Sequence, residues 1–264
     1  NAATSFHKPD CVPRAVVEAM QHAGNSGRGS SGEAMAASRL IFNTRCQIAE
    51  MFDVWGPECV AFTSNDTEAL NIALQGTLHP EEGTLHAICT EMDHNSVLRP
   101  LYRLEKKGME LTILPADRKG RISLTELEAA IRPETKVIVC THASNLTGNL
   151  NDIHAIGEIA QKHQKLFIVD AAQTAGVFPI SMKKDHIDIL CFSGHKGLMG
   201  PQGTGAICVR PGVSVEPLKV GGSGVLTFQR EHPQDMPETL EAGTLNSHGI
   251  AGLGAAMDWI RETG

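Results

Sequence analysis

The sequence lacks a long apolar run and a cluster of basic residues, and both absences exclude functions. No stretch approaches the roughly 18 consecutive apolar residues that a membrane-spanning helix needs, so we expect no association with a membrane. The 264 residues include 30 acidic and 23 basic side chains, for a net charge of −7. Without a basic run, nucleic-acid binding is not expected.

The sequence also lacks any pattern of paired cysteines. None of its seven cysteines forms a C-x-x-C pair, and their number is odd. Cys89, Cys140, Cys191 and Cys208 lie inside apolar runs, where buried free thiols are ordinary. We therefore expect a reducing compartment, the cytoplasm, instead of a disulfide framework. We find no secretory signal pattern, internal repeat or low-complexity tail.

Short apolar runs alternate with helical patterns along most of the chain. Strands are expected at residues 60–64, 85–90, 110–116, 136–141, 166–170, 189–192 and 205–210, the last of which closes the sheet. Helices are expected at residues 12–23, 33–52, 65–75, 94–107, 123–131, 151–163 and 248–261. This alternation predicts a three-layer α/β/α fold around a mostly parallel, seven-stranded, doubly wound sheet.

A lysine flanked by glycines follows one of these predicted strands. The apolar residues 189–192 end at Ser193, and Lys196 then stands between His195 and Gly197. Ligands of open α/β sheets bind at the carboxyl ends of the strands. A lysine desolvated there is a nucleophile toward aldehydes. The alternative is a solvated loop lysine.

A second predicted strand ends at Asp170, 26 residues before Lys196 (196 − 170 = 26). That spacing is about one strand–crossover–strand unit, which would put both residues at the same edge of a parallel sheet. A buried carboxylate needs a partner. A pyridinium nitrogen is one such partner, and proteins hold pyridoxal phosphate by a lysine Schiff base with an aspartate on the ring nitrogen.

Five motifs together resemble those of the class V aminotransferase family, and within it the cysteine desulfurase branch. They are residues 63–68 (TSNDTE), 92–96 (MDHNS), 169–173 (VDAAQ), 193–196 (SGHK) and 241–246 (EAGTLN). They follow the family's order and cover nearly the whole chain, although each is weak by itself. The resemblance implies an N-terminal segment (residues 1–15), a large domain of the pyridoxal-phosphate-dependent transferase fold (residues 16–246), and a helix (residues 247–264) leading toward a small carboxyl-terminal domain.

The resemblance implies three catalytic residues. Lys196 would hold pyridoxal 5′-phosphate as a Schiff base and, once freed, remove the Cα proton of the substrate. Asp170 would keep the ring nitrogen protonated. His94 would lie over the ring and shuttle protons, although a lone histidine at a strand end is otherwise structural.

The resemblance also implies further cofactor-binding residues, and no metal. They are Thr67, Ser193, His195 and a partner subunit's Thr244 at the phosphate, Asn145 at the phenolic oxygen, and Gln173 near the ring. Residues 65–68 open a predicted helix, whose free N–H groups suit an anion, but they serve equally as simple caps. Asp66, in the same motif as Thr67, is also counted among the cofactor-binding residues, although it does not fit a phosphate site well because a carboxylate repels phosphate. Its side chain should point away or act as a cap. Asn145 is equally a turn residue.

The implied reaction converts cysteine to alanine and passes the sulfur to an enzyme persulfide. This implies a role in sulfur metabolism and iron–sulfur cluster assembly, a homodimer, and a sulfur-acceptor protein. The alternatives are a selenocysteine lyase, another class V aminotransferase, lyase or epimerase, or a non-catalytic α/β domain that binds a phosphate-bearing ligand or a protein partner.

Both ends of the sequence depart from the family pattern. The first residues (NAAT) match the end of the family's opening motif, so a few residues are expected to precede them. The family's persulfide-forming cysteine and carboxylate-binding arginine belong to the small domain that would follow residue 264. We therefore expect a truncated copy, a fragment, or a divergent member without desulfurase turnover. Cys11, the one cysteine near a flexible end, is expected to have no role.

Two loops are also candidates for a functional role. Residues 211–243 are rich in glycine and proline and read as a long functional loop. Their apolar side chains are expected to be buried in a dimer interface: Val220, Val225, Leu226 and Phe228. Arg28 lies in a glycine-rich loop, where it is either a solvated charge or a wall of the substrate cleft.

Overall fold

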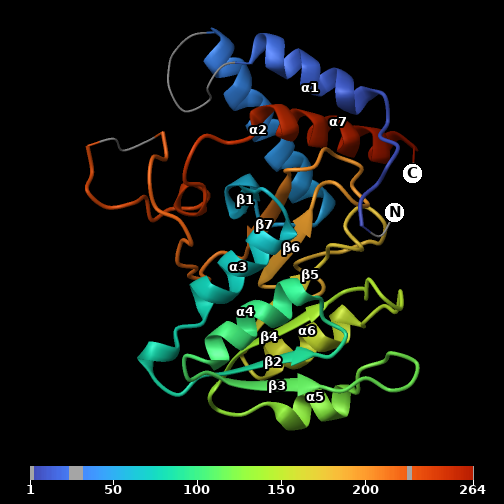
Figure 1. Cartoon of the computed structure of the whole chain (residues 1–264), viewed down its shortest axis with the longest axis vertical. Helices are drawn as coiled ribbons and strands as arrows, with labels where there is room; N and C mark the ends of the chain where they lie inside the picture. Colours follow the sequence, from blue (N-terminus) through green and yellow to red (C-terminus); the bar gives the residue numbers. More distant parts are fainter. Residues whose placement is uncertain (1–2, 24–31, 225–227, 264) are drawn as a thin grey trace.

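The fold is an α/β sandwich built on one sheet, as predicted from the alternating pattern. A computed structural model describes residues 3–23, 32–224 and 228–263 (Figure 1). The strands are β1 (Val60–Thr63), β2 (His86–Thr90), β3 (Glu110–Leu114), β4 (Thr135–Thr141), β5 (Leu166–Asp170), β6 (Ile189–Ser193) and β7 (Gly205–Val209). The helices are α1 (Cys11–His22), α2 (Gly32–Met51), α3 (Asp66–Thr77), α4 (Asn95–Glu105), α5 (Leu124–Ala130), α6 (Ile153–Lys162) and α7 (Ser247–Thr263). Short 3-10 turns are η1 (Pro57–Cys59), η2 (Pro80–Glu82) and η3 (Glu238–Leu240).

The strand order is β1-β7-β6-β5-β4-β2-β3, and the sheet is mostly parallel. The strands from β2 to β6 pair in parallel, whereas β7 runs antiparallel to both β1 and β6. The expectation that the last strand closes the sheet is corrected in one respect. β7 lies inside the sheet, because the chain after β6 returns through a short loop without a crossover helix and so pairs antiparallel.

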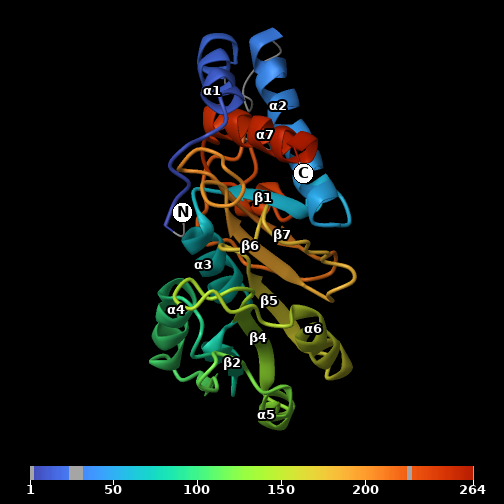
Figure 2. The ribbon, with the colours of Figure 1, turned by 90° about the vertical axis from the view of Figure 1, so that its right-hand side faces the viewer.

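Helices cover both faces of the sheet, which makes the three predicted layers. Successive strand residues point to opposite faces. Phe167 and Val169 of β5 pack in the same cluster as α2, α5, α6 and α7. Ile168, between them, packs in the cluster that contains α3 and α4. Figure 2 shows α3 and α4 on one side of the sheet and α6 on the other.

The first and last helices are neighbours. α1 packs against α7, and α7 also packs against α2, so that the three gather beyond β1 at one end of the molecule (Figures 1 and 2). A Cβ at Gly252 of α7 would meet Val16 of α1 at 2.7 Å, so this close approach needs glycine. Within the described residues, no helix is both long and apolar enough to cross a membrane.

Candidate active site

The carboxyl ends of four strands meet at one edge of the sheet. Asp170, the last residue of β5, is paired with Thr141 of β4 and with Cys191 of β6. Ser193 at the end of β6 and Thr63 at the end of β1 are both opposite Gly205 of β7. The loop with Lys196 and the start of α3 leave from this edge, so the predicted common edge for Asp170 and Lys196 is confirmed.

Asp170 is a buried acid in the middle of this edge. It is 2% exposed, and its carboxylate accepts a hydrogen bond from the Ala172 N–H at 2.8 Å. Burial raises the pKa of Asp170, while the Ala172 hydrogen bond and the positive charges of Lys196 and His94 oppose that shift. No basic side chain among the described residues lies within 4.0 Å of the carboxylate. The carboxylate therefore suits a cationic ligand atom.

His94 caps the first turn of α4 and is connected to α3 through a serine. Its Nδ1 accepts the Ser96 N–H at 3.2 Å, so the ring proton is placed on Nε2 in the neutral form. The Ser96 hydroxyl lies 2.9 Å from His94 Nδ1 and 2.8 Å from the Thr67 hydroxyl. Ser96 was not among the predicted site residues, although it stands inside the MDHNS motif.

A second residue of that motif, Asp93, was also missed. Its carboxylate accepts hydrogen bonds from Thr90 N–H at 2.7 Å, from the Thr90 hydroxyl at 2.9 Å and from Thr141 N–H. Burial raises the pKa of Asp93 to about 7 against these hydrogen bonds, and the charge of Asp170 adds to that rise. Asp93 joins the ends of β2 and β4 and thereby positions the loop that carries His94.

The first turn of α3 has a defined cap. The side chain of Asn65 accepts the Glu68 N–H at 2.9 Å, and the Asp66 N–H donates to the Ser193 hydroxyl at 3.0 Å. Among the described residues, the Thr67 N–H has no acceptor. The suggestion that Asp66 caps the helix is wrong, because Asn65 is the cap, and Asp66 is buried at 5% exposure. The suggestion that its side chain points away from a phosphate stays a prediction.

His195 faces the beginning of the chain. Its Nδ1 lies 3.0 Å from the Thr4 hydroxyl, and its carbonyl accepts the Ser5 N–H at 3.0 Å and the Lys8 amine at 3.2 Å. Burial lowers the pKa of His195, and the charges of Lys196 and Lys8 lower it further. The contact of Thr4 and Lys8 with this edge was not predicted from the sequence.

Asn145 and Gln173 lie on loops at the same edge. Asn145 is exposed in the turn after β4, where the Ser144 hydroxyl accepts the Leu146 N–H at 3.3 Å. Asn145 therefore lies in a turn, as one of the two interpretations of the sequence predicted. Gln173 is partly exposed in the turn after Asp170. Their contacts with a cofactor stay predictions.

Thr244 is exposed and lies close to the start of α3 in its own chain. It lines a cavity of about 170 Å³ together with Ser64, Glu68 and Lys219. The Lys219 amine and the Glu68 carboxylate are 2.5 Å apart, so these two charges of the cavity lining are paired. A contribution of Thr244 to a partner subunit stays a prediction.

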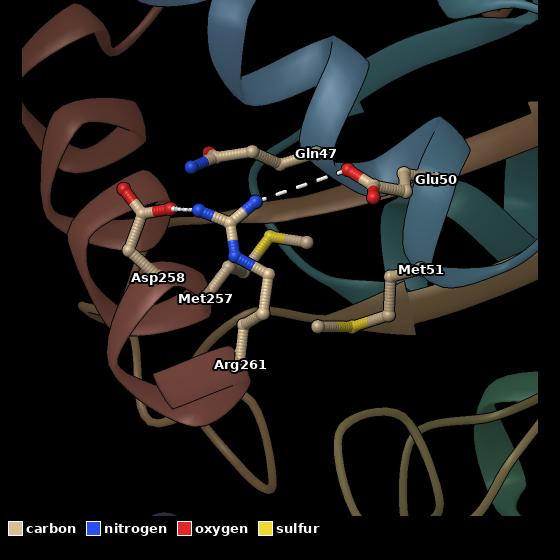
Figure 3. Close-up of a pocket in the computed structure, with 6 residues that line it drawn as sticks. All are labelled: Gln47, Glu50, Met51, Met257, Asp258 and Arg261. Carbon is tan, nitrogen blue, oxygen red and sulfur yellow. Dashed lines mark hydrogen bonds and ion pairs between the residues drawn. The ribbon is translucent and has the colours of Figure 1, made fainter. Parts of the chain in front are cut away.

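A different cavity, of about 270 Å³, lies between α2 and α7, away from the predicted site residues. Figure 3 shows Arg261 between Asp258 and Glu50, with Met51 and Met257 below. Arg261 is 2.7 Å from Asp258 and 3.8 Å from Glu50. Its charge is thus balanced within the protein, and this cavity offers little to a charged ligand.

Three predicted residues lie outside the described part of the chain: Arg28, Val225 and Leu226. Within residues 3–23, 32–224 and 228–263, no group of histidines, cysteines and acids is arranged to hold a metal ion.

The chain is similar to known proteins along its whole length. The model of the family "Aminotransferase class-V" matches residues 1–264. A probable cysteine desulfurase of Methanothermobacter thermautotrophicus is 34% identical over 269 residues, which cover 100% of this chain and 66% of the relative. The apo structure of the cysteine desulfurase from Thermococcus onnurineus NA1 superposes with a TM-score of 0.91 and 32% identity, covering 99% of this chain and 66% of that one. The structure of SspA in complex with cysteine has a TM-score of 0.87 and 30% identity, covering 97% and 71%.

The chain spans 66% of the length of each of the two cysteine desulfurases. Its fold, with a mixed and mostly parallel sheet, agrees with that of the Thermococcus onnurineus cysteine desulfurase. The family is dependent on pyridoxal phosphate. Because the family model matches every residue, this protein belongs to the aminotransferase class-V family, as a relative of the cysteine desulfurases.

Proposed function

We propose that this chain binds pyridoxal 5′-phosphate and activates cysteine at the sheet edge that carries Asp170 and Lys196. The observation that carries the proposal is the buried Asp170 carboxylate at the end of β5, at the sheet edge from which the loop with Lys196 leaves. Relatives named as cysteine desulfurases and the cysteine complex of SspA support cysteine over other amino acids.

The residues at this edge fit the cofactor. The buried Asp170 suits a protonated ring nitrogen, and the free Thr67 N–H at the positive end of α3 suits a phosphate. Thr67, Ser193 and a partner's Thr244 would hold the phosphate, with His195 beside them. When bound, the cofactor supplies an electron sink for a negative charge developing at the substrate Cα.

The chain's own residues would move the proton. The Lys196 amine would take the proton from the substrate Cα, and the Asp170 carboxylate would keep a positive charge on the ring side of the site. His94, held by Ser96 with its Nε2 proton free, would donate toward the ligand. Asn145 and Gln173 would contact ring substituents from their loops.

The test is spectroscopic. The purified chain should hold pyridoxal 5′-phosphate with an absorbance band in the visible range that shifts when L-cysteine is added. A protein that binds the cofactor but does not respond to cysteine would point to another amino acid. A colourless protein with no affinity for the cofactor would favour a non-catalytic binding domain and contradict the proposal.

Sulfur release is not expected from these 264 residues alone. All seven cysteines are free, and burial raises the pKa of five of them: Cys59, Cys89, Cys140, Cys191 and Cys208. A buried, protonated thiol is a poor nucleophile. Two cysteines remain: Cys46 lies partly buried within α2, and Cys11 begins α1 and contacts the Ala255 carbonyl through its Sγ at 3.5 Å. Repeated turnovers to alanine and sulfide that survive Cys11→Ala would contradict this expectation, and any sulfur-acceptor protein would then act on the chain directly.

Replacing Asp170 with asparagine should slow removal of the Cα proton by about 10²–10³-fold, as for other lost charge contacts in an active site. An amide does not stabilise a charged ring nitrogen as a carboxylate does. The measurement is solvent exchange of the Cα proton of L-alanine, followed by NMR in deuterated water. Asp188→Asn is the control, because Asp188 is also buried, at 8% exposure, but lies before β6 at the opposite end of the strand. Equal exchange in Asp170→Asn and the unmodified chain would mean that Asp170 is only structural.

We further propose that the chain is a homodimer in which the loop of residues 211–243 meets the partner. Phe228 and Val220 are exposed, at 101% and 71%, although both are apolar. Phe228→Ser together with Val220→Ser should raise the dimer dissociation constant by about tenfold or more, because each side chain buries apolar surface. Light scattering over a dilution series measures this. Met20→Ser on α1, which is 63% exposed, is the control. A monomer with full cofactor occupancy would refute a site that is shared between two chains.

A further inference from the structure

Asp66 is the residue of the site whose position the proposed function does not explain. It is the first residue of α3, a helix of 12 residues, and it is 5% exposed. Among the described residues, its Oδ1 has no hydrogen-bond partner. Since Asn65 already caps the helix, capping does not account for the burial of the Asp66 carboxyl at this place.

The charged groups around Asp66 come from three elements. Asp170 approaches from the end of β5 and Lys196 from the loop after β6, and the thiol of Cys191 lies on β6. Glu68, on α3 itself, is occupied by the Ser64 hydroxyl at 2.6 Å and by Lys219. Burial raises the pKa of Asp66 well above its usual range, Asp170 raises it further, and Lys196 opposes the rise.

A phosphate bound at the start of α3 would lie next to the residue that carries this carboxyl. The unpartnered Oδ1 belongs to the residue next to Thr67, whose N–H is free for a phosphate oxygen. A carboxylate and a phosphate dianion repel strongly where water is excluded. A protonated carboxyl, in contrast, has an O–H that donates to a phosphate oxygen. Proton uptake by one of the two groups would remove this repulsion.

We propose that Asp66 takes up one proton from solvent when the phosphate group of a phosphate monoester binds at the start of α3, and then donates a hydrogen bond to that phosphate. The change is the formation of one O–H bond on the carboxylate, with the proton supplied by buffer. This inference rests on the proposed function, because it requires pyridoxal 5′-phosphate to bind at this edge.

The proposal predicts the direction in which the dissociation constant changes with pH. The bound phosphate stabilises the protonated carboxyl, so binding takes up a proton at pH values above the pKa of Asp66 in the free protein. Over that range the dissociation constant should rise by about tenfold for each pH unit, relative to a variant in which residue 66 does not titrate. Below that range Asp66 is already protonated, and the dissociation constants of the unmodified chain and of the variant should change with pH in the same way.

The test is calorimetric titration with pyridoxal 5′-phosphate between pH 6 and pH 9, in buffers that differ in ionisation enthalpy. The heat difference between buffers gives the number of protons taken up. In Asp66→Asn the amide has the same size and still donates to phosphate. The unmodified chain should take up about one proton more than this variant at the alkaline end. Asp152→Asn, at the cap of α6, is the control and should match the unmodified chain.

Three further results are informative. If the unmodified chain and Asp66→Asn take up equal numbers of protons at every pH, this inference is wrong while the proposed function stands. If pyridoxal without phosphate gives the same difference, Asp66 responds to the ring and the inference is also wrong. Failure of the unmodified chain to bind pyridoxal 5′-phosphate would overturn the proposed function itself. Should Asp66→Asn fail to fold, Asp66→Ala serves instead, with weaker binding and the same loss of the extra proton.

Discussion

Lys196→Ala is expected to abolish covalent attachment of pyridoxal 5′-phosphate and, with it, exchange of the substrate Cα proton. Lys196 follows the buried strand β6, and its charge reaches both Asp170 and Asp66. Without its amine, the site loses the nucleophile that we assign to the cofactor and the base that we assign to the Cα proton. Borohydride reduction followed by peptide mapping should place the adduct on the peptide with Lys196 in the unmodified chain and give none in the variant.

Lys8 provides a matched control, because it is a second lysine beside the same loop. Its amine is 2.5 Å from the Ser5 hydroxyl and 3.2 Å from the His195 carbonyl, and burial lowers its pKa. A lowered pKa would favour Lys8 as a nucleophile if its place in the fold were ignored. Lys8→Ala should keep the adduct on Lys196. An adduct that persists in Lys196→Ala and disappears in Lys8→Ala would transfer the chemistry to Lys8.

Arg45→Ala is expected to lower the free energy of unfolding by about 3–5 kcal/mol, which is typical when one partner of a buried ion pair is removed. Arg45 on α2 is 2.6 Å from Glu241, with both side chains buried. Glu241 also accepts the Phe62 N–H at 2.6 Å, and burial raises its pKa in spite of Arg45. Removing the guanidinium leaves a buried acid at the start of the segment that carries Thr244. Chemical denaturation at fixed protein concentration measures the loss.

Arg132→Ala is the control for this experiment. Arg132 is 2.6 Å from Glu110, the same separation as in the buried pair, but the two side chains are 42% and 53% exposed. An exposed pair contributes only about 0–1 kcal/mol. Replacing both Arg45 and Glu241 with methionine should recover most of the stability lost in Arg45→Ala, because no buried charge is then left alone. Equal losses in Arg45→Ala and Arg132→Ala would show that burial of the ion pair does not matter here.

The strands could be predicted because each is a short, buried, apolar run with turn residues on both sides. The place of β7 could not, since an apolar run says nothing about which neighbour it pairs with or in which direction. Its antiparallel position between β1 and β6 follows from the short return after Ser193. The pairing of α1 with α7 likewise depends on glycines such as Gly252, whose role is visible only once two helices touch.

The common sheet edge of Lys196 and Asp170 could be predicted from the sequence, because spacing and strand ends suffice to bring the two residues to one edge. The sequence also determined the order of the motifs, and with it the family. Only the tertiary structure decided which side chains interact: that the buried Asp66 is within electrostatic reach of Asp170 and Lys196, that Ser96 connects Thr67 to His94, and that Arg45 pairs with Glu241. The reason is physical. Strand and helix periods are local, whereas burial, hydrogen bonding and the charge on a carboxyl depend on residues that are distant in the chain and meet only in the folded protein.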